Sequence, residues 1–172
     1  MSKLWDEIQK SSTSSPNKLA IIGNDSSYTW DDLYHATLNI SRQLTASSHK
    51  VIALYTDNSP EWVIIDLSCH LAGITLLPLP AFFSVQQLQH AIKQSGLTAI
   101  IHQINDRIST LLRLANDDGL SLLGHKLILQ NIKQQTVTLP KGTEKITFTS
   151  GSTGQPKGVC LSNELQLHVA ES

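Results

Sequence analysis

One stretch, from Ile146 to Leu161, constrains the chain more than any other part of its sequence. It begins with apolar residues that alternate with threonines, which is typical of a β-strand with one buried face. Small and hydroxylated residues follow from Ser150 to Gln155, and then a Pro-Lys-Gly step with Lys157 at its centre. Apolar residues resume at Val159. The pattern therefore predicts two strands joined by a loop of glycines, hydroxyls and one lysine.

A loop of this composition has the chemistry to wrap a phosphate. Glycines let backbone N–H groups approach an anion, hydroxyls add adaptable donors, and a lysine adds a compact positive charge. Composition alone leaves open an ordinary Gly/Ser hairpin loop, which is commoner. The nucleoside-triphosphate loop G-x-x-x-x-G-K-[ST] matches poorly, because Lys157 follows Pro156, which has no N–H, and precedes no predicted helix. A phosphotransferase with an unusual loop of that kind also needs an acidic magnesium-binding strand, which the sequence does not offer.

The residues from Thr149 to Gly158 read T-S-G-S-T-G-Q-P-K-G. This run resembles, without interruption, the signature loop of the adenylate-forming (AMP-binding) enzymes, which include the acyl-CoA synthetases and the adenylation domains of peptide synthetases. The resemblance implies that the loop holds the β- and γ-phosphates of ATP while a carboxylate attacks the α-phosphate. The implied phosphate-binding residues are Thr149, Ser150, Gly151, Ser152, Thr153, Gly154 and Lys157. Thr149 is also the implied neighbour of a magnesium ion, and no catalytic residue is assigned within the chain.

Weaker similarity to the same family runs upstream in the same order, over 28–33, 51–62 and 71–80. The resemblance thus covers nearly the whole chain, and the acyl-CoA synthetase branch fits better than the peptide-synthetase branch. There is one departure. The family often has Thr-His where this chain has Ser162-Asn163, so the acyl-site role of that histidine is not carried over.

Family members are several times longer, and their adenine segment, ribose segment and mobile C-terminal domain lie downstream. We therefore expect residues 1–172 to be a truncated N-terminal portion of an AMP-binding domain, lacking the downstream part and the C-terminal lid domain, and inactive alone. The resemblance implies an AMP-forming acid–thiol ligase as the parent enzyme, working in fatty acid or other acyl metabolism. It would use Mg²⁺ and ATP to convert a carboxylic acid to an acyl-adenylate, then to a thioester of coenzyme A or a carrier protein. The alternative is a non-catalytic nucleotide-binding or interaction module of the same fold.

Short apolar runs alternate with helical segments, which predicts an α/β fold with a largely parallel sheet flanked by helices. The runs are 51–55, 74–77, 98–102 and 126–129. Helix starts are predicted at Thr29 and Ser84 with capping boxes, at Ser59, and at Asn105 or Asp106. We expect a β-hairpin over 19–29, a polar linker from Ser11 to Ser15 and an edge strand over 137–139. Phe82 and Phe83 are expected in the core, and the alternative is that they guide an acyl chain.

Composition excludes several classes of function. The 172 residues carry a net charge of −1, so no electrostatic field recruits nucleic acid. Cys69 and Cys160 lie in separate apolar runs, which indicates buried thiols in a reducing cytoplasm. No histidine pair has metal-ligand spacing on one helix face, and no membrane span is predicted.

A truncated parallel sheet leaves an uncovered edge, so we expect self-association.

Overall fold

The computed structural model describes residues 3–103, 107–113, 119–124, 126–132, 137–149 and 156–171. The chain divides into two compact units, each built from two separate segments. The first unit comprises Met1–Ser47 and Asp57–Ala72, and the second comprises Ser48–Thr56 and Gly73–Ser172.

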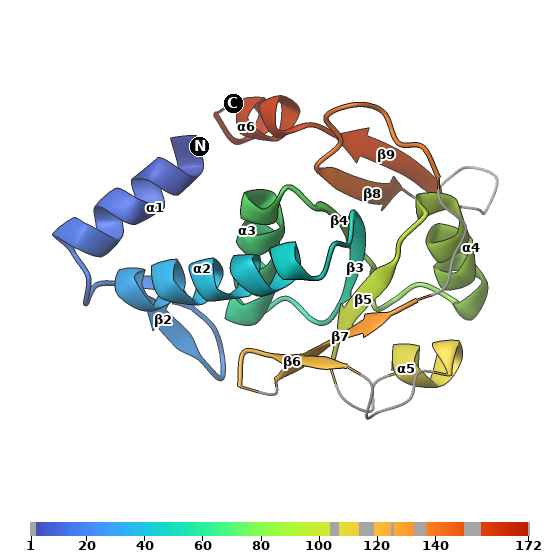
Figure 1. Ribbon diagram of the computed structural model, residues 1–172, viewed down its shortest axis with the longest axis horizontal. Coiled ribbons are helices and arrows are strands. Elements are labelled where there is room, and N and C mark those ends of the chain that lie inside the picture. Colours follow the sequence, from blue (N-terminus) through green and yellow to red (C-terminus); the bar gives the residue numbers. More distant parts are fainter. Residues whose placement is uncertain are drawn as a thin grey trace. The chain divides into compact units, whose positions relative to one another are not determined.

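The first unit contains three helices and a small antiparallel hairpin (Figure 1). In chain order its elements are α1 (Lys3–Ser14), β1 (Leu19–Ile22), β2 (Ser27–Thr29), α2 (Trp30–Ala46) and α3 (Pro60–Ala72). The predicted hairpin is confirmed, since β1 pairs with β2. The predicted start of α2 is confirmed as well. The Asp32 amide donates to the Thr29 hydroxyl at 3.2 Å, and the Thr29 amide donates to the Asp32 carboxylate at 3.0 Å.

A buried carboxylate joins the hairpin of this unit to the start of α3. Glu61 is buried and accepts hydrogen bonds from the Ser26 hydroxyl and the Tyr28 hydroxyl, each at 3.0 Å. A buried charge is costly unless it is hydrogen-bonded, and these two donors lower that cost. The predicted cap of α3 is also present, because the Trp62 amide donates to the Ser59 hydroxyl at 3.2 Å.

The polar linker expected from Ser11 to Ser15 is largely wrong, since α1 extends to Ser14. Serine and threonine hydroxyls can bond to a carbonyl one turn earlier instead of breaking the helix. Here the hydroxyls of Ser12 and Thr13 both donate to the Gln9 carbonyl, at 2.9 Å and 3.1 Å. Ser12 is buried on the same helix as Trp5 and Ile8, so packing overrides its weak helix propensity.

The second unit contains a seven-stranded sheet with the order β6-β7-β5-β3-β4-β8-β9. Its strands are β3 (Val51–Tyr55), β4 (Thr75–Pro78), β5 (Ala99–His102), β6 (Leu120–Leu122), β7 (Leu127–Asn131), β8 (Lys145–Thr149) and β9 (Lys157–Leu161). Its helices are α4 (Val85–Ser95), α5 (Arg107–Leu112) and α6 (Asn163–Glu171). Figure 1 shows α4 beside the strands of this sheet.

The prediction of an α/β fold with a largely parallel sheet is confirmed. β3 lies between β4 and β5 and is parallel to both, and β4 is parallel to β8. Every residue of β3 is buried, as expected of a strand covered on both faces. The two sides of the sheet make it mixed, because β7 is antiparallel to β5 and β9 is antiparallel to β8. The unpredicted strand β6 explains the first reversal, since it pairs with β7 as a hairpin before β7 meets β5.

Two further expectations in this unit need correction. Residues 137–139 form no strand; Val137 instead lies against the end of α4, where a side chain at Gly96 would come within 2.6 Å of the Val137 amide nitrogen. Phe83 is in the core as expected, but Phe82 is 86% exposed.

The predicted caps at Asn105 or Asp106 lie outside the described residues. Self-association stays a prediction; in the described sheet the outer strands are β6 and β9.

The core of the second unit forms between α4 and the sheet. Leu88, Ala91 and Ile92 of α4 are buried against strand residues that include Ala53, Leu77, Ile100 and Ile146. α4 is held in place by its caps. The Ser84 hydroxyl accepts from the Gln87 amide at 3.2 Å, and the Ser84 amide donates to the Gln87 side chain at 2.9 Å. Gly96 ends the helix in the left-handed conformation with φ 63°.

Replacing the Ser84 cap should destabilise the chain measurably. We expect Ser84→Ala to lower the free energy of unfolding by about 1 kcal/mol, because an α4 amide loses its acceptor. Gln86→Ala, at an exposed position of the same helix, is the control and should change stability by less than about 0.5 kcal/mol. Urea unfolding followed by circular dichroism measures both. Equal effects of the two variants would contradict the capping role.

Candidate functional site

The loop singled out by the sequence connects β8 and β9, which form an antiparallel hairpin at one side of the sheet. Their register pairs Lys145 with Leu161 at one end and Thr149 with Lys157 at the other. The loop therefore leaves the sheet from the pair Thr149 and Lys157. The expected phosphate ligands Ser150, Gly151, Ser152, Thr153 and Gly154 lie outside the described residues.

Thr149 and Lys157 are direct cross-strand partners, so they lie on the same face of the hairpin. Both residues are exposed. The pairing thus brings together, at the root of the loop, two of the residues that the sequence assigned to phosphate binding. A hydroxyl and an ammonium group on one face can donate to the same anion.

The charge of Lys157 is available to an external ligand. Lys157 forms no ion pair with any residue that the structure describes. A lysine already paired with a carboxylate would lose much of its attraction for phosphate, because the two opposite charges cancel at short range. Its exposure and lack of a described partner are what an anion site requires.

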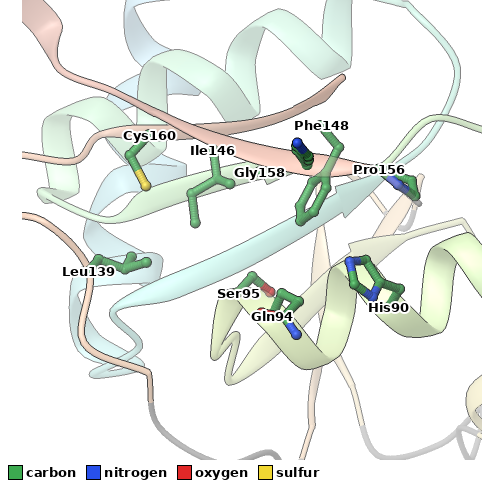
Figure 2. A pocket seen from close by; sticks show the side chains of 10 residues that line it. His90, Gln94, Ser95, Leu139, Ile146, Phe148, Pro156, Gly158 and Cys160 are labelled. Carbon is green, nitrogen blue, oxygen red and sulfur yellow. The ribbon is translucent and has the colours of Figure 1, made fainter. Parts of the chain in front are cut away.

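The opposite face of the hairpin is apolar and borders a cavity. Ile146 pairs with Cys160, and Phe148 pairs with Gly158, so these four residues lie on the face away from Thr149 and Lys157. Figure 2 shows Phe148 and Ile146 projecting from the hairpin on the side that faces α4. The cavity between this face of the hairpin and α4 has a volume of about 470 Å³. Its lining includes His90, Gln94 and Ser95 from α4 together with Leu139 and Pro156, and Lys157 also borders it at the end of β9.

The sequence did not predict this cavity. His90 and Gln94 are more than fifty residues from the hairpin, and only the packing of α4 on the sheet brings them there. A signal was nevertheless present in the strand itself. The alternation of Ile146 and Phe148 with Thr147 and Thr149 indicates that one face is apolar and covered, while the other is polar.

Further features near the site are a helix cap at Ser162 and a half-buried thiol at Cys160. Ser162 caps α6, since its hydroxyl accepts from the Leu165 amide at 3.3 Å. Both cysteines are free thiols, but Cys160 is half-buried, whereas Cys69 is buried as expected. Within the described part of the chain, no three histidine, cysteine or acidic side chains cluster as a metal site. The described helices include none with the length and apolarity to cross a bilayer.

Comparison with known proteins gives consistent matches along the whole chain. The sequence profile of a family described as AMP-binding enzyme matches residues 8–171. The 2-succinylbenzoate–CoA ligase of Staphylococcus epidermidis is 28% identical over 157 residues, which are 88% of this chain and 31% of that protein. The D-alanine–D-alanyl carrier protein ligase of Bacillus mycoides is 26% identical over 168 residues, or 93% of this chain and 32% of that protein. The chain thus spans about a third of the length of these curated relatives.

Solved structures show the same fold. The o-succinylbenzoate coenzyme A synthetase of Bacillus subtilis in complex with AMP has a TM-score of 0.68 at 20% identity, covering 97% of this chain and 44% of that one. The same enzyme in complex with ATP and magnesium has a TM-score of 0.67 at 19% identity, covering 97% of this chain and 45% of that one.

The different burial of the two thiols gives a direct test of the cavity. We expect iodoacetamide to modify Cys160 well before Cys69 in the folded chain, because Cys160 lines the cavity and Cys69 is 1% exposed. Mass spectrometry of timed samples locates the modified thiol. Cys160→Ser is the control and should leave no rapidly reacting thiol. Equal reaction rates of the two cysteines in the folded chain would contradict this burial.

Proposed function

Because the chain belongs to the AMP-binding enzyme family, whose profile covers residues 8–171, we propose that it forms the N-terminal portion of an AMP-binding domain. The parent protein in this proposal is an AMP-forming acid–thiol ligase, and its downstream domains supply the rest of the active site. The curated relatives are ligases, and each is about three times as long as the aligned segment.

The observation that carries the proposal is the pair Thr149 and Lys157. Their side chains are exposed on one face of the hairpin, at the two ends of the loop whose sequence resembles the family's phosphate loop. Lys157 has no described ion pair that would occupy its charge. An exposed hydroxyl and an uncompensated ammonium group at the root of a glycine-rich loop fit a polyphosphate better than any apolar or cationic ligand.

In the proposed reaction a carboxylate oxygen of the acid attacks the α-phosphorus of ATP. The bond from that phosphorus to the oxygen bridging the α- and β-phosphates breaks, so pyrophosphate leaves and an acyl-adenylate forms. Catalysis of such a transfer consists mainly of positioning and of stabilising charge. The chain contributes to both by holding the departing pyrophosphate.

Each member of the proposed site has a distinct task. Backbone N–H groups from Gly151 to Gly154 and the hydroxyls of Thr149, Ser150, Ser152 and Thr153 donate to the β- and γ-phosphate oxygens. Lys157 offsets the negative charge that builds up on pyrophosphate as it leaves. Thr149 is the residue we propose nearest to Mg²⁺, which supplies further charge neutralisation when bound with ATP. The complex of the similar Bacillus subtilis enzyme with ATP and magnesium supports both groups at the family level.

We propose a carboxylic acid as the substrate class, without restricting it to fatty acids. The names of the curated relatives specify 2-succinylbenzoate in one case and D-alanine in the other, and neither is a fatty acid. Those relatives transfer to coenzyme A and to a carrier protein, so a thiol acceptor of either kind is the proposed second partner. The two free thiols of this chain fit a reducing compartment, which supports the cytoplasm as the proposed location.

Removing the lysine should weaken binding of the leaving group. We expect Lys157→Ala to lower the affinity of the chain for magnesium pyrophosphate about 10- to 150-fold, because one charge-assisted contact contributes about 1.5–3 kcal/mol. Titration followed by NMR chemical shifts measures affinities in the weak range expected here. Lys141→Ala is the matched control, because it removes an exposed lysine outside the hairpin. A loss below twofold for Lys157→Ala would show that the lysine does not contact the anion.

The chain alone should not catalyse adenylation. Ordering the phosphate loop on ATP costs conformational entropy, and without adenine and ribose contacts few interactions offset this cost. ATP should therefore bind weakly. We expect no acid-dependent exchange of labelled pyrophosphate into ATP by residues 1–172. Calorimetric titration with ATP and AMP completes the experiment, because tight specific binding by this chain would favour a non-catalytic nucleotide-binding module. Measurable exchange would show that the adenylation site is complete within these residues.

A further inference from the structure

The aromatic ring of Phe148 lies next to Gly158, at the root of the loop. Phe148 and Gly158 are direct cross-strand partners, one pair before Thr149 and Lys157. A methyl group at position 158 would lie 3.3 Å from Cζ and 3.4 Å from Cε1 of the Phe148 ring. The ring therefore lies beside the backbone of β9, and an alanine at 158 would fit only if the ring moved by a few tenths of an ångström.

The same ring is packed on its other side. Phe148 is half-buried against the core formed by α4 and the sheet, and it borders the cavity that His90 and Gln94 line from α4. In Figure 2 the ring extends from the hairpin toward the side where His90 lies. Phe148 thus joins β9, through the backbone of Gly158, to the core of the second unit.

We infer that Phe148 and Gly158 form a positioning pair that sets the spacing of Thr149 and Lys157 at the phosphate loop; this inference rests on the proposed function. The two pairs are adjacent along the hairpin, so a change in strand separation at one pair reaches the next. The ring acts from the face opposite the phosphate ligands, and it needs no contact with the ligand. The side chains of a binding site must be held within about 0.5 Å of their working positions. The end of a hairpin that lacks packing would move by more than this.

Gly158 is placed here by packing and not by backbone conformation. Gly158 has no positive φ, whereas Gly73, Gly96, Gly124 and Gly142 do. An L-residue is therefore compatible with its backbone, and a methyl group there would be in tight contact with the ring of Phe148, which would have to move by a few tenths of an ångström. A smaller residue at 148 should then make room for a side chain at 158.

The effects of substitutions at 148 and 158 should therefore compensate for each other, which can be tested. We compare Gly158→Ala, Phe148→Leu and the double variant with the wild-type chain, using Val159→Ala as the matched control. Val159 is the next residue of β9 and lies on the other face of the hairpin, away from the ring. Two measurements are made on each protein: hydrogen exchange of the backbone amides along the hairpin by NMR, and titration with magnesium pyrophosphate.

We expect Gly158→Ala to speed amide exchange at the Thr149 and Lys157 end of the hairpin while leaving the Lys145 and Leu161 end unchanged. Its affinity for pyrophosphate should fall about tenfold, the equivalent of one lost charge-assisted contact. The double variant should recover most of both properties, because leucine reaches less far across β9. In the wild-type spectrum the α-protons of Gly158 should be shifted upfield by the ring, and Phe148→Leu should abolish that shift.

Different failures have different meanings. Exchange and affinity unchanged in Gly158→Ala would overturn the positioning role, and so would equal losses in Val159→Ala or a double variant worse than both single variants. A wild-type chain that binds no pyrophosphate would overturn the proposed phosphate site instead. In that case the exchange pattern and the α-proton shift still decide whether the ring holds the end of the hairpin.

Discussion

The antiparallel pairing of β8 with β9 is the constraint on which the candidate site depends. Because side chains alternate along paired strands, one register places Thr149 and Lys157 together on one face and Phe148 and Gly158 together on the other. A shift of β9 by one residue against β8 would turn Lys157 toward the packed face and away from Thr149. The buried position of Ile146, which is 3% exposed, fixes which face is packed.

The hairpin is attached to the sheet near the end that is distant from the loop. β8 pairs with β4 through Leu76 and Lys145, and the Leu76 amide donates to the Glu144 carbonyl at 2.9 Å. The Thr75 hydroxyl donates to the Thr143 carbonyl at 2.7 Å next to this pair. The pairing with β4 thus holds the start of β8, while packing of Phe148 against the core holds the region nearer the loop. This division is the basis of the positioning role proposed for Phe148.

The sequence predicted best those features that arise from residues close together in the chain. The capping boxes at Thr29 and Ser84 are local hydrogen-bond patterns, and both are present. The features that were missed depend on distant partners. The helical conformation of Ser12 follows from its burial, and the direction of β7 follows from its pairing with β6 and β5. No pattern within residues 126–129 specifies which neighbour the strand will meet.

The site shows the same limit. Thr149 and Lys157 were identified from the loop motif, and their facing arrangement follows from two strands that the motif itself implies. The cavity behind them was not predictable, because α4 delivers His90 and Gln94 through the packing of Leu88 and Ile92 on the sheet. Sequence motifs thus specify ligands at a loop, whereas the support of that loop is encoded in core positions that carry no motif.

The interleaving of the two units has a consequence for how such a chain can be recombined. β3, the central strand of the sheet, is followed by a return to the first unit for α3 before the sheet resumes at β4. Cleavage at any one peptide bond between Ser47 and Gly73 therefore separates the parts of at least one unit. Exchange of either unit with that of a homologue requires three crossovers, after Ser47, Thr56 and Ala72, so these units are inherited together unless all three junctions are preserved.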